Sequence, residues 1–247
     1  IWPFPDEESL WSLDRSIDAV VDIMKVLNIP VISGKDSLSS TYRGPSGVIK
    51  SPPVLCISVF GKIPDVTKTV SSDFKSAGST IVLVGQLGIE AMAGSTYFDV
   101  HGILGDEIPK IDLGLLPKVL YTMHKAIVSG KVLSSHDISE GGLITSIFEM
   151  CVGGNVGVDL NLAGLEASNL RGWNGERPDY FLFNETAGVF VVEVENEQMA
   201  KELFRGIPYT ILGKTQKEKI IEVRDLFSVD VAQLQKAWQQ PMKEIFS

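Results

Sequence analysis

The sequence predicts a layered α/β or α+β domain in which a mixed sheet packs against helices. Apolar runs such as STIVLVGQ at 79–86 and AGVFVVEV at 187–194 are typical of strands buried on both faces. Between such runs, apolar residues recur at the spacing of one helix face, as they do at 116–129. At 247 residues, the chain can bury a full core and hold one large domain or two small ones.

Composition excludes several classes of protein. The chain carries 22 Lys and Arg against 31 Asp and Glu, a formal net charge of -9, and no basic block that would attract nucleic acid. Its longest apolar stretches are too short to span a bilayer, and its first residues lack the layout of a signal peptide. We therefore expect a soluble cytoplasmic protein that binds neither nucleic acid nor membrane. Cys56 and Cys151 lack zinc-site spacing, so we expect two buried thiols.

The first expected element is an amphipathic helix over residues 6–28. Asp6 stands at its capping position, acids follow in the first turn, and Pro30 ends the helix. We expect a short strand at 31–33, then the polar segment GKDSLSS at 34–40, then a loop at TYRGPSG. The apolar stripe of the helix consists of Leu13, Ile17, Val20, Val21, Met24 and Leu27.

The middle of the chain alternates strands and helices. PPVLCISVFGKI at 52–63 is bounded by prolines and polar residues and, like the run at 79–86, predicts a strand buried on both faces. The helix at 116–129 ends before Gly130, and VLSS at 132–135 predicts a short strand. The later elements are a half-exposed strand at 156–162, a buried strand at 187–194, a helix at 196–206, strands at 209–214 and 219–223, and a closing helix from about Val231.

The most polar motif is SSHDISEGGLITSIFEM at 134–150, which leads through two glycines into a helix. Backbone N–H groups at a helix start can hold a phosphate. Asp137 and Glu140 would repel that phosphate, since two charges 4 Å apart interact by roughly 4 kcal/mol at a dielectric near 20. Mg²⁺ removes the conflict, because it binds carboxylates together with phosphate oxygens. A capping box formed by Asp137 and Glu140 explains the acids equally well.

His136 lies between Ser135 and Asp137 in this motif. Neighbours on an extended chain point to opposite faces, which argues against a Ser-His-Asp triad. The default expectation for His136 is a polar loop histidine, with binding or proton transfer as the alternative.

Two further segments raise the same question. In GKDSLSS, Lys35 suits a phosphate, and Asp36 and Ser37 could act as ligands or donors, although the Walker A pattern is absent and a solvated turn is the alternative. In FLFNETAG, Glu185 and Thr186 precede a buried strand, and a simple turn is the alternative there.

Taken together, GKDSLSS, the AGS at 93–95, SHDISEGGL and FNETAG resemble the phosphoribosylformylglycinamidine synthases of the AIR-synthetase-like superfamily. The resemblance extends from the helix before GKDS to the closing helix with Trp238. It implies that residues 1–50 end an ATP-binding N-terminal domain and that 51–247 form an AIR-synthetase-like C-terminal domain. We place the boundary near 43–52, where RGPSGVIKSPP separates the two parts.

The resemblance also implies a reaction. The parent would be an ATP-dependent ligase of purine biosynthesis, acting on a phosphorylated substrate, formylglycinamide ribonucleotide, with ammonia from a glutaminase domain or subunit. ATP or ADP and Mg²⁺ would be its cofactors, and further synthetase domains would complete the site. The implied metal ligand is Asp137, and the residues implied to bind nucleotide or substrate are Lys35, Asp36, Ser37, His136, Ser139, Gly141, Gly142, Glu185 and Thr186.

One position departs from the family pattern. Members often carry arginine after the glycine of the ETxG motif, whereas this chain has Val189. The departure favours an auxiliary nucleotide site over the primary one. A catalytically silent scaffold domain therefore stays open as an alternative, as does another superfamily enzyme such as selenophosphate synthetase. The chain by itself is expected to be inactive and to self-associate through the apolar helix stripe and unpaired strand edge near its N-terminus.

Overall fold

The computed structural model describes residues 1–163, 165 and 175–246. The chain divides into two compact units, Ile1–Pro64 and Asp65–Ser247. The boundary expected near residues 43–52 lies inside the first unit. Among the described residues, no helix combines the length and the apolar character that crossing a membrane requires.

The second unit is built on a seven-stranded mixed sheet with the order β4-β6-β3-β7-β5-β8-β9. Its paired strands are antiparallel except for β5 and β8, which run parallel. The predicted mixed sheet is confirmed. The strands are β3 (Thr80–Val84), β4 (Val132–Asp137), β5 (Gly157–Leu160), β6 (Phe190–Val194), β7 (Tyr209–Gln216), β8 (Ile220–Val223) and β9 (Phe227–Asp230).

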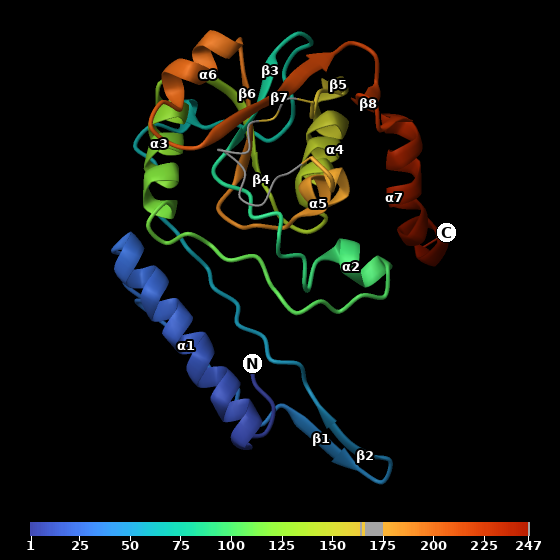
Figure 1. Ribbon diagram of the computed structural model, residues 1–247. Coiled ribbons are helices and arrows are strands. Elements are labelled where there is room, and N and C mark those ends of the chain that lie inside the picture. Colours follow the sequence, from blue (N-terminus) through green and yellow to red (C-terminus); the bar gives the residue numbers. More distant parts are fainter. Residues whose placement is uncertain (164, 166–174, 247) are drawn as a thin grey trace. The chain divides into compact units, whose positions relative to one another are not determined.

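Helices cover both faces of this sheet (Figure 1). One face carries α3 (Leu116–Val128) and α6 (Glu197–Leu203), and the other carries α4 (Gly142–Gly154), α5 (Pro178–Phe183) and α7 (Val231–Phe246). Two further short helices are η1 (Val66–Lys68) and α2 (Thr96–Val100).

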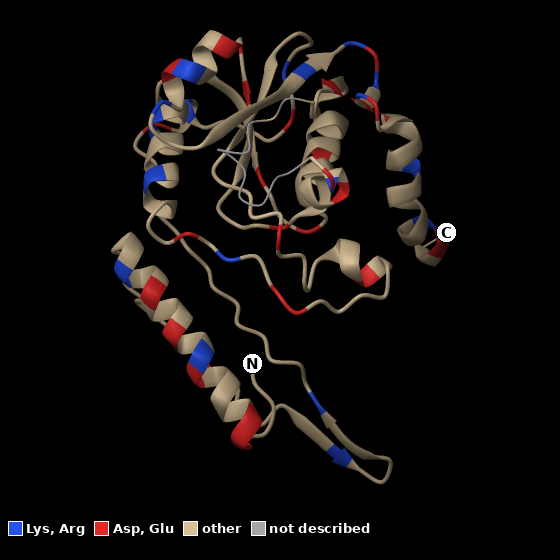
Figure 2. Cartoon of the chain, in the orientation of Figure 1, with Lys and Arg blue, Asp and Glu red and all other residues tan. Residues whose placement is uncertain are grey.

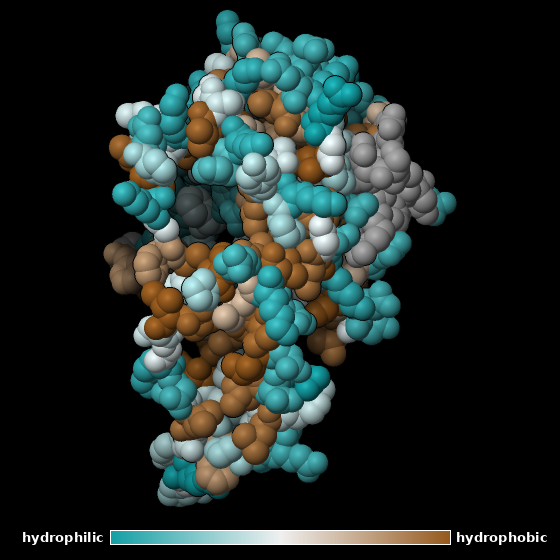
Figure 3. Space-filling view, turned by 90° about the vertical axis from the view of Figure 1, so that its left-hand side faces the viewer, coloured by the Kyte–Doolittle hydropathy of each residue, from teal (hydrophilic) through white to brown (hydrophobic). Residues whose placement is uncertain are grey.

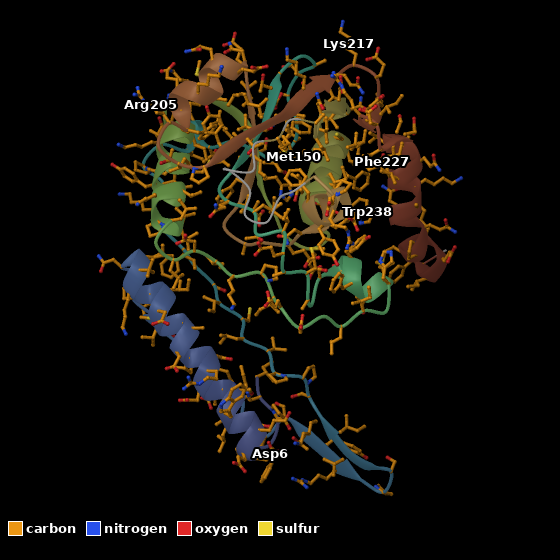
Figure 4. All side chains as sticks on the ribbon, in the orientation of Figure 1. Asp6, Met150, Arg205, Lys217, Phe227 and Trp238 are labelled. Atoms are coloured by element: carbon orange, nitrogen blue, oxygen red, sulfur yellow. The ribbon has the colours of Figure 1, made fainter. Side chains whose placement is uncertain are left out.

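Two hydrophobic clusters fill the space between these layers. Ile81 and Leu83 of β3 belong to the cluster under α4 and α5, whereas Val82 and Val84 belong to the cluster under α3 and α6. This alternation follows from the strand period of two residues. Met150 of α4 lies in the first cluster, between its helix and the sheet (Figure 4).

Most of the helices and strands predicted for the second unit are confirmed. The predicted solvent exposure of one strand, β5, is wrong. Strand β5 is not half-exposed, because three of its four residues are buried between β7 and β8. Helices α2 and α5 and strand β9 lie in segments for which the sequence predicted no regular structure. All three are short, so they show too few residues to establish a period.

The first unit contains α1 (Glu7–Leu27) and a hairpin of β1 (Thr41–Gly44) and β2 (Gly47–Lys50). The helix is capped as predicted, with the side chain of Asp6 accepting from the N–H of Ser9 at 3.0 Å (Figure 4). The prediction of a loop at TYRGPSG is wrong, because these residues form β1, the turn and the first residue of β2. The strand expected at 31–33 is also wrong, as these described residues have no regular structure.

Residues 52–63 contradict the predicted buried strand. These residues are all described, form no strand and are exposed, with Val59 and Phe60 at 74% and 81% of their full exposure. A strand needs neighbours that pair with its backbone, and the backbone bonds described for this segment join only Val54 and Ile1.

The two cysteines differ in burial. Cys56, in the exposed segment 52–63, is exposed, contrary to prediction. Cys151 is buried as predicted, and burial raises the pKa of its thiol to about 12.

Candidate functional site

Three polar segments of the second unit meet at the start of helix α4. They are the SEGG loop (Ser139–Gly142), the AGST loop (Ala93–Thr96) and the NET segment (Asn184–Thr186). One carboxylate oxygen, Oε1 of Glu185, accepts from the N–H of Thr96 and from the N–H of Gly141, both at 2.8 Å. Glu185 and Gly141, which the sequence selected, therefore lie together with Thr96.

The other two residues of the NET segment are buried and fully engaged. Asn184 has no exposed surface, and its amide nitrogen donates to the carbonyls of Gly88 and Ala91 at 2.9 Å each. Its amide oxygen accepts from the N–H and the hydroxyl of Thr186. The Thr186 hydroxyl in turn accepts from the N–H of Gly88 at 3.1 Å. These two side chains hold the loop before Ala93 in place. The NET segment is therefore hydrogen-bonded to another part of the chain and is more than a simple turn.

The SEGG loop is not a capping box. Asp137 is the last residue of β4, and the helix begins after Gly141, whose φ of 81° is left-handed and which has no capping side chain among the described residues. Glu140 is exposed instead of reaching back to the helix start. The N–H of Gly142 donates to the carbonyl of Ser139 at 3.0 Å, which closes the loop as a turn. The capping explanation of the two acids is therefore wrong.

The structure explains the glycine pair through packing. Gly142 has a φ of 73°, and a Cβ there would lie 2.5 Å from the carbonyl carbon of Phe183, at the end of α5. A Cβ on Gly141 would lie 2.4 Å from the hydroxyl of Thr145. Both glycines are required by backbone conformation and by close approach, whether or not a phosphate binds there.

His136 lies on β4 and is not a loop histidine. Its side chain is 18% exposed, its Nε2 lies 3.0 Å from the carboxylate of Glu149 on α4, and its Nδ1 lies 2.7 Å from the carbonyl oxygen of Asp137. These contacts orient the imidazole beside Asp137. Sequence reasoning missed Glu149, because an exposed acid in the middle of a helix looks like ordinary solvated surface.

Asp137 is the residue best placed to meet a ligand from solvent. Its side chain is 66% exposed, and its carboxylate lies 3.3 Å from Nδ1 of His136. In the described part of the chain, no three His, Cys, Asp or Glu side chains group into a metal site. Mg²⁺ commonly binds through one or two carboxylates, phosphate oxygens and water, so Asp137 fits as one ligand of a site that a nucleotide helps to form. Figure 2 shows acidic residues where the loops below β4 and α5 meet.

A hollow of about 260 Å³ opens beside the AGST loop. It is lined by Gly94, Ser95, Thr96, Asp99, Ile103 and Leu104. Ser95 is buried and caps α2 by accepting from the N–H of Phe98 at 3.2 Å. Thr96 therefore lines the hollow and also donates its N–H to Glu185.

Helix α2 is also tied to α5. The hydroxyl of Tyr97 donates to Asp179 at 2.9 Å, and its ring stacks on Phe183 at a centroid distance of 4.8 Å. Two hydrogen bonds from Arg177 lower the pKa of Asp179 to about 2, because the cation stabilises the ionised carboxylate. The AGST loop is therefore anchored on both sides of Thr96.

Lys35, Asp36 and Ser37 belong to the first unit. The ammonium group of Lys35 donates to the carbonyl of Asp36 and the hydroxyl of Ser37 within its own loop. The carbonyl of Ser37 accepts from the N–H of Trp2 at 2.9 Å, which holds this loop beside the first residues. That these residues share a site with those of the second unit stays a prediction.

Comparison with known proteins shows the family of this chain. Residues 76–225 match the model of the family described as AIR synthase related protein, C-terminal domain. Two phosphoribosylformylglycinamidine synthase subunits PurL, from Deinococcus radiodurans and an Anaeromyxobacter species, are 29% and 32% identical over 96% and 94% of this chain. The chain spans only 32% and 30% of the length of these relatives.

Solved structures show the same fold. Thermotoga maritima PurL complexed with FGAR aligns with a TM-score of 0.65 at 18% identity, over 88% of this chain and 36% of that one. The complex of the same protein with ATP aligns with a TM-score of 0.61 at 17% identity, over 88% and 34%.

Proposed function

This chain belongs to the AIR synthase related family through its C-terminal domain, and we propose from this that it is part of a phosphoribosylformylglycinamidine synthase. The supporting observation is that relatives with that name match 94–96% of the chain. The proposed parent forms a C–N bond: ATP phosphorylates the amide oxygen of formylglycinamide ribonucleotide, and ammonia from glutamine then displaces the phosphate. We also propose that the parent is a cytoplasmic protein, as its composition suggests.

The proposed role of the second unit is to bind Mg-nucleotide or the phosphorylated substrate. Asp137 is the proposed metal ligand, since it is exposed and adjoins the SEGG loop. When bound, Mg²⁺ would neutralise phosphate charge next to that carboxylate. His136, Ser139, Gly141 and Gly142 are the proposed lining of the same place, where helix α4 contributes the positive end of its dipole.

In the first unit, Lys35, Asp36 and Ser37 are the proposed contribution to the phosphate site. A lysine ammonium is a compact point charge that can turn from its own loop toward a phosphate. The proposed partners are further synthetase domains and a glutaminase. A solved complex described as PurLQS from Thermotoga maritima, to which this chain is similar in fold, supports the proposal of a multi-part assembly.

A second candidate function is a nucleotide-holding scaffold without catalysis. Val189 favours it, because this side chain is 2% exposed and stands where family members often carry an arginine. A buried valine offers no contact to an anion. This candidate predicts that the parent retains nucleotide in the second unit without turning it over.

The test is an assay of the parent protein that contains this chain, with ATP, formylglycinamide ribonucleotide and either glutamine or ammonia. Asp137→Asn should weaken Mg-ATP binding and lower turnover by at least about tenfold, the change that about 1.4 kcal/mol produces. Glu140→Gln, an exposed acid of the same loop, is the matched control and should stay within about twofold. A parent that forms no formylglycinamidine ribonucleotide would contradict the enzyme, and retained nucleotide with unchanged turnover in Asp137→Asn would favour the scaffold.

A further inference from the structure

We propose that Glu185 is a positioning residue that joins the AGST loop and the SEGG loop into one binding unit. A single carboxylate oxygen accepts from two backbone N–H groups, those of Thr96 and Gly141, each at 2.8 Å. These two residues lie far apart in the sequence and begin different helices, so no local contact holds them together.

The charge of Glu185 suits this place. Gly141 is the N-cap of α4, a helix of 13 residues, where the aligned peptide dipoles favour a negative group. Hydrogen bonds from backbone N–H groups to an ionised carboxylate are stronger than those to a neutral acceptor. The carboxylate therefore satisfies two N–H groups that the helices leave without a partner inside their own ladders.

The backbone that carries Glu185 is itself fixed. On either side, Asn184 and Thr186 are buried and hydrogen-bonded to Gly88 and to each other. Next to it, Phe183 packs so closely against Gly142 that a Cβ on the glycine would lie 2.5 Å from the phenylalanine backbone. Glu185 therefore reaches both N–H groups from a rigid base, which is what a positioning residue requires.

The consequence for binding depends on the proposed function. If the SEGG and AGST loops hold a nucleotide or a phosphorylated substrate, Glu185 keeps both loops in register before the ligand arrives. Its Oε1 already accepts two hydrogen bonds, so this oxygen supports the loops and is not available as a ligand. We therefore assign Glu185 a positioning role through Oε1, beside the direct binding that the family resemblance implies for this residue.

The first test measures amide hydrogen exchange by NMR in the 247-residue chain. Glu185→Ala removes the shared acceptor, so the amides of Thr96 and Gly141 should exchange at least about tenfold faster, as the loss of a charge-assisted hydrogen bond predicts. Glu185→Gln keeps an oxygen in the same place and should remain within about threefold of the wild type. Gly88, whose amide is bound by Thr186, should be unchanged in both variants.

Two controls secure this measurement. Glu195→Ala removes an exposed glutamate after β6 and should alter neither amide. The Ala variant keeps the Tyr97 stack on Phe183 and the Asn184 hydrogen bonds, so α2 stays docked and the variant should fold. Unchanged exchange at both amides in Glu185→Ala, or faster exchange at only one of them, would overturn the joining role.

The second test measures Mg-ATP affinity of the parent protein by calorimetry. Glu185→Ala should weaken binding by about tenfold, and Glu185→Gln should restore it to within about threefold. An equal loss in both variants, with the amides of Thr96 and Gly141 still protected in Glu185→Gln, would mean that the carboxylate itself contacts metal or ligand, which overturns positioning. If the wild-type parent binds no Mg-ATP, the proposed function fails, while the exchange experiment still decides the role of Glu185.

Discussion

Two segments of this chain have the same near-continuous apolar pattern, but only one of them forms a buried strand. STIVLVGQ forms β3, whose five residues are all buried, with β6 on one side and β7 on the other. PPVLCISVFGKI forms no strand in the described first unit, and its side chains are exposed. An apolar run is therefore compatible with a buried strand, but it forms one only where neighbouring strands pair with its backbone and cover its side chains.

The same difference separates the two units as wholes. The second unit has two hydrophobic clusters beneath its helices. In α1, by contrast, the only buried residue is Ser9, and Figure 3 shows hydrophobic surface over the part of the molecule that holds the first unit. Large exposed apolar side chains of the first unit include Leu10, Trp11, Ile17, Val21, Ile29, Val31, Ile32, Val54, Leu55, Ile57, Val59, Phe60 and Ile63.

The largest expected effect tests burial directly. Leu83→Ala in β3 should lower the free energy of unfolding by about 2–5 kcal/mol, because it leaves a cavity in a closed cluster. Leu55→Ala, at a leucine that is 47% exposed, should change it by about 0.5 kcal/mol or less. Urea unfolding followed by circular dichroism measures both. Equal losses would contradict the contrast between the two runs.

The next effect compares two glycines of the candidate site. Gly142→Ala forces a Cβ against the backbone of Phe183 at a left-handed φ, so we expect a loss of about 2–3 kcal/mol in unfolding free energy. Gly34→Ala meets nothing within 4 Å and should stay within about 0.5 kcal/mol. Thermal unfolding of the two variants decides this. A tolerated Gly142→Ala would show that packing does not explain the glycine pair.

The third effect concerns association. The isolated chain should self-associate through the exposed apolar side chains of its first unit. Phe60→Lys, at a side chain that is 81% exposed, should raise the dissociation constant by about tenfold without changing the stability of the second unit. Ser46→Lys, in the exposed turn of the hairpin, is the control for added charge. Light scattering over a concentration series measures this, and a particle that stays monomeric at every concentration would refute it.

The smallest effect is a pH dependence in the second unit. The pKa of Asp179 is lowered to about 2 by Arg177, so the ionised carboxylate stabilises the fold above its unfolded pKa near 4. That contribution, about 1 kcal/mol after solvent screening, is lost as pH falls toward 2. Asp179→Asn should therefore be less stable than wild type at pH 7 and converge with it near pH 2, in urea unfolding at several pH values. Exposed Asp106→Asn should show no such convergence.

The sequence predicted the longer elements, whose apolar residues follow a regular pattern. Strand β3 lies inside the sheet of the second unit, and helix α3 and the closing helix α7 pack against that sheet. Trp238 of α7, for instance, meets Phe148 of α4 edge to face (Figure 4). The sequence analysis missed the hairpin of β1 and β2. The residues GPSG are typical of any loop, and only the pairing of the strands on either side shows that they form a hairpin turn.

The candidate site was predicted as a set of residues and not as an arrangement. The motifs selected Glu185 and Gly141, which a hydrogen bond joins in the structure, and their predicted role in binding stays a prediction. No local pattern could show that Glu185 reaches Thr96, or that Glu149 meets His136, because both contacts depend on how separate loops cross after folding. Side-chain pairing across the fold follows from the topology of the sheet, which periodicity does not specify.

The pairing of β3 has a consequence for synthesis on the ribosome. Its Val84 pairs with Phe190 of β6, and its Thr80 pairs with Lys214 of β7, so both partners are made long after β3 itself. At about 5–20 residues per second, the apolar strand waits roughly 5 to 20 s before β6 begins to appear and roughly 6 to 25 s before β7 does. Contacts of such long range also slow the folding step. Among the described strands of the second unit, β3 is thus the one that waits longest for its partners in the nascent chain, although all five of its residues are buried in the folded protein.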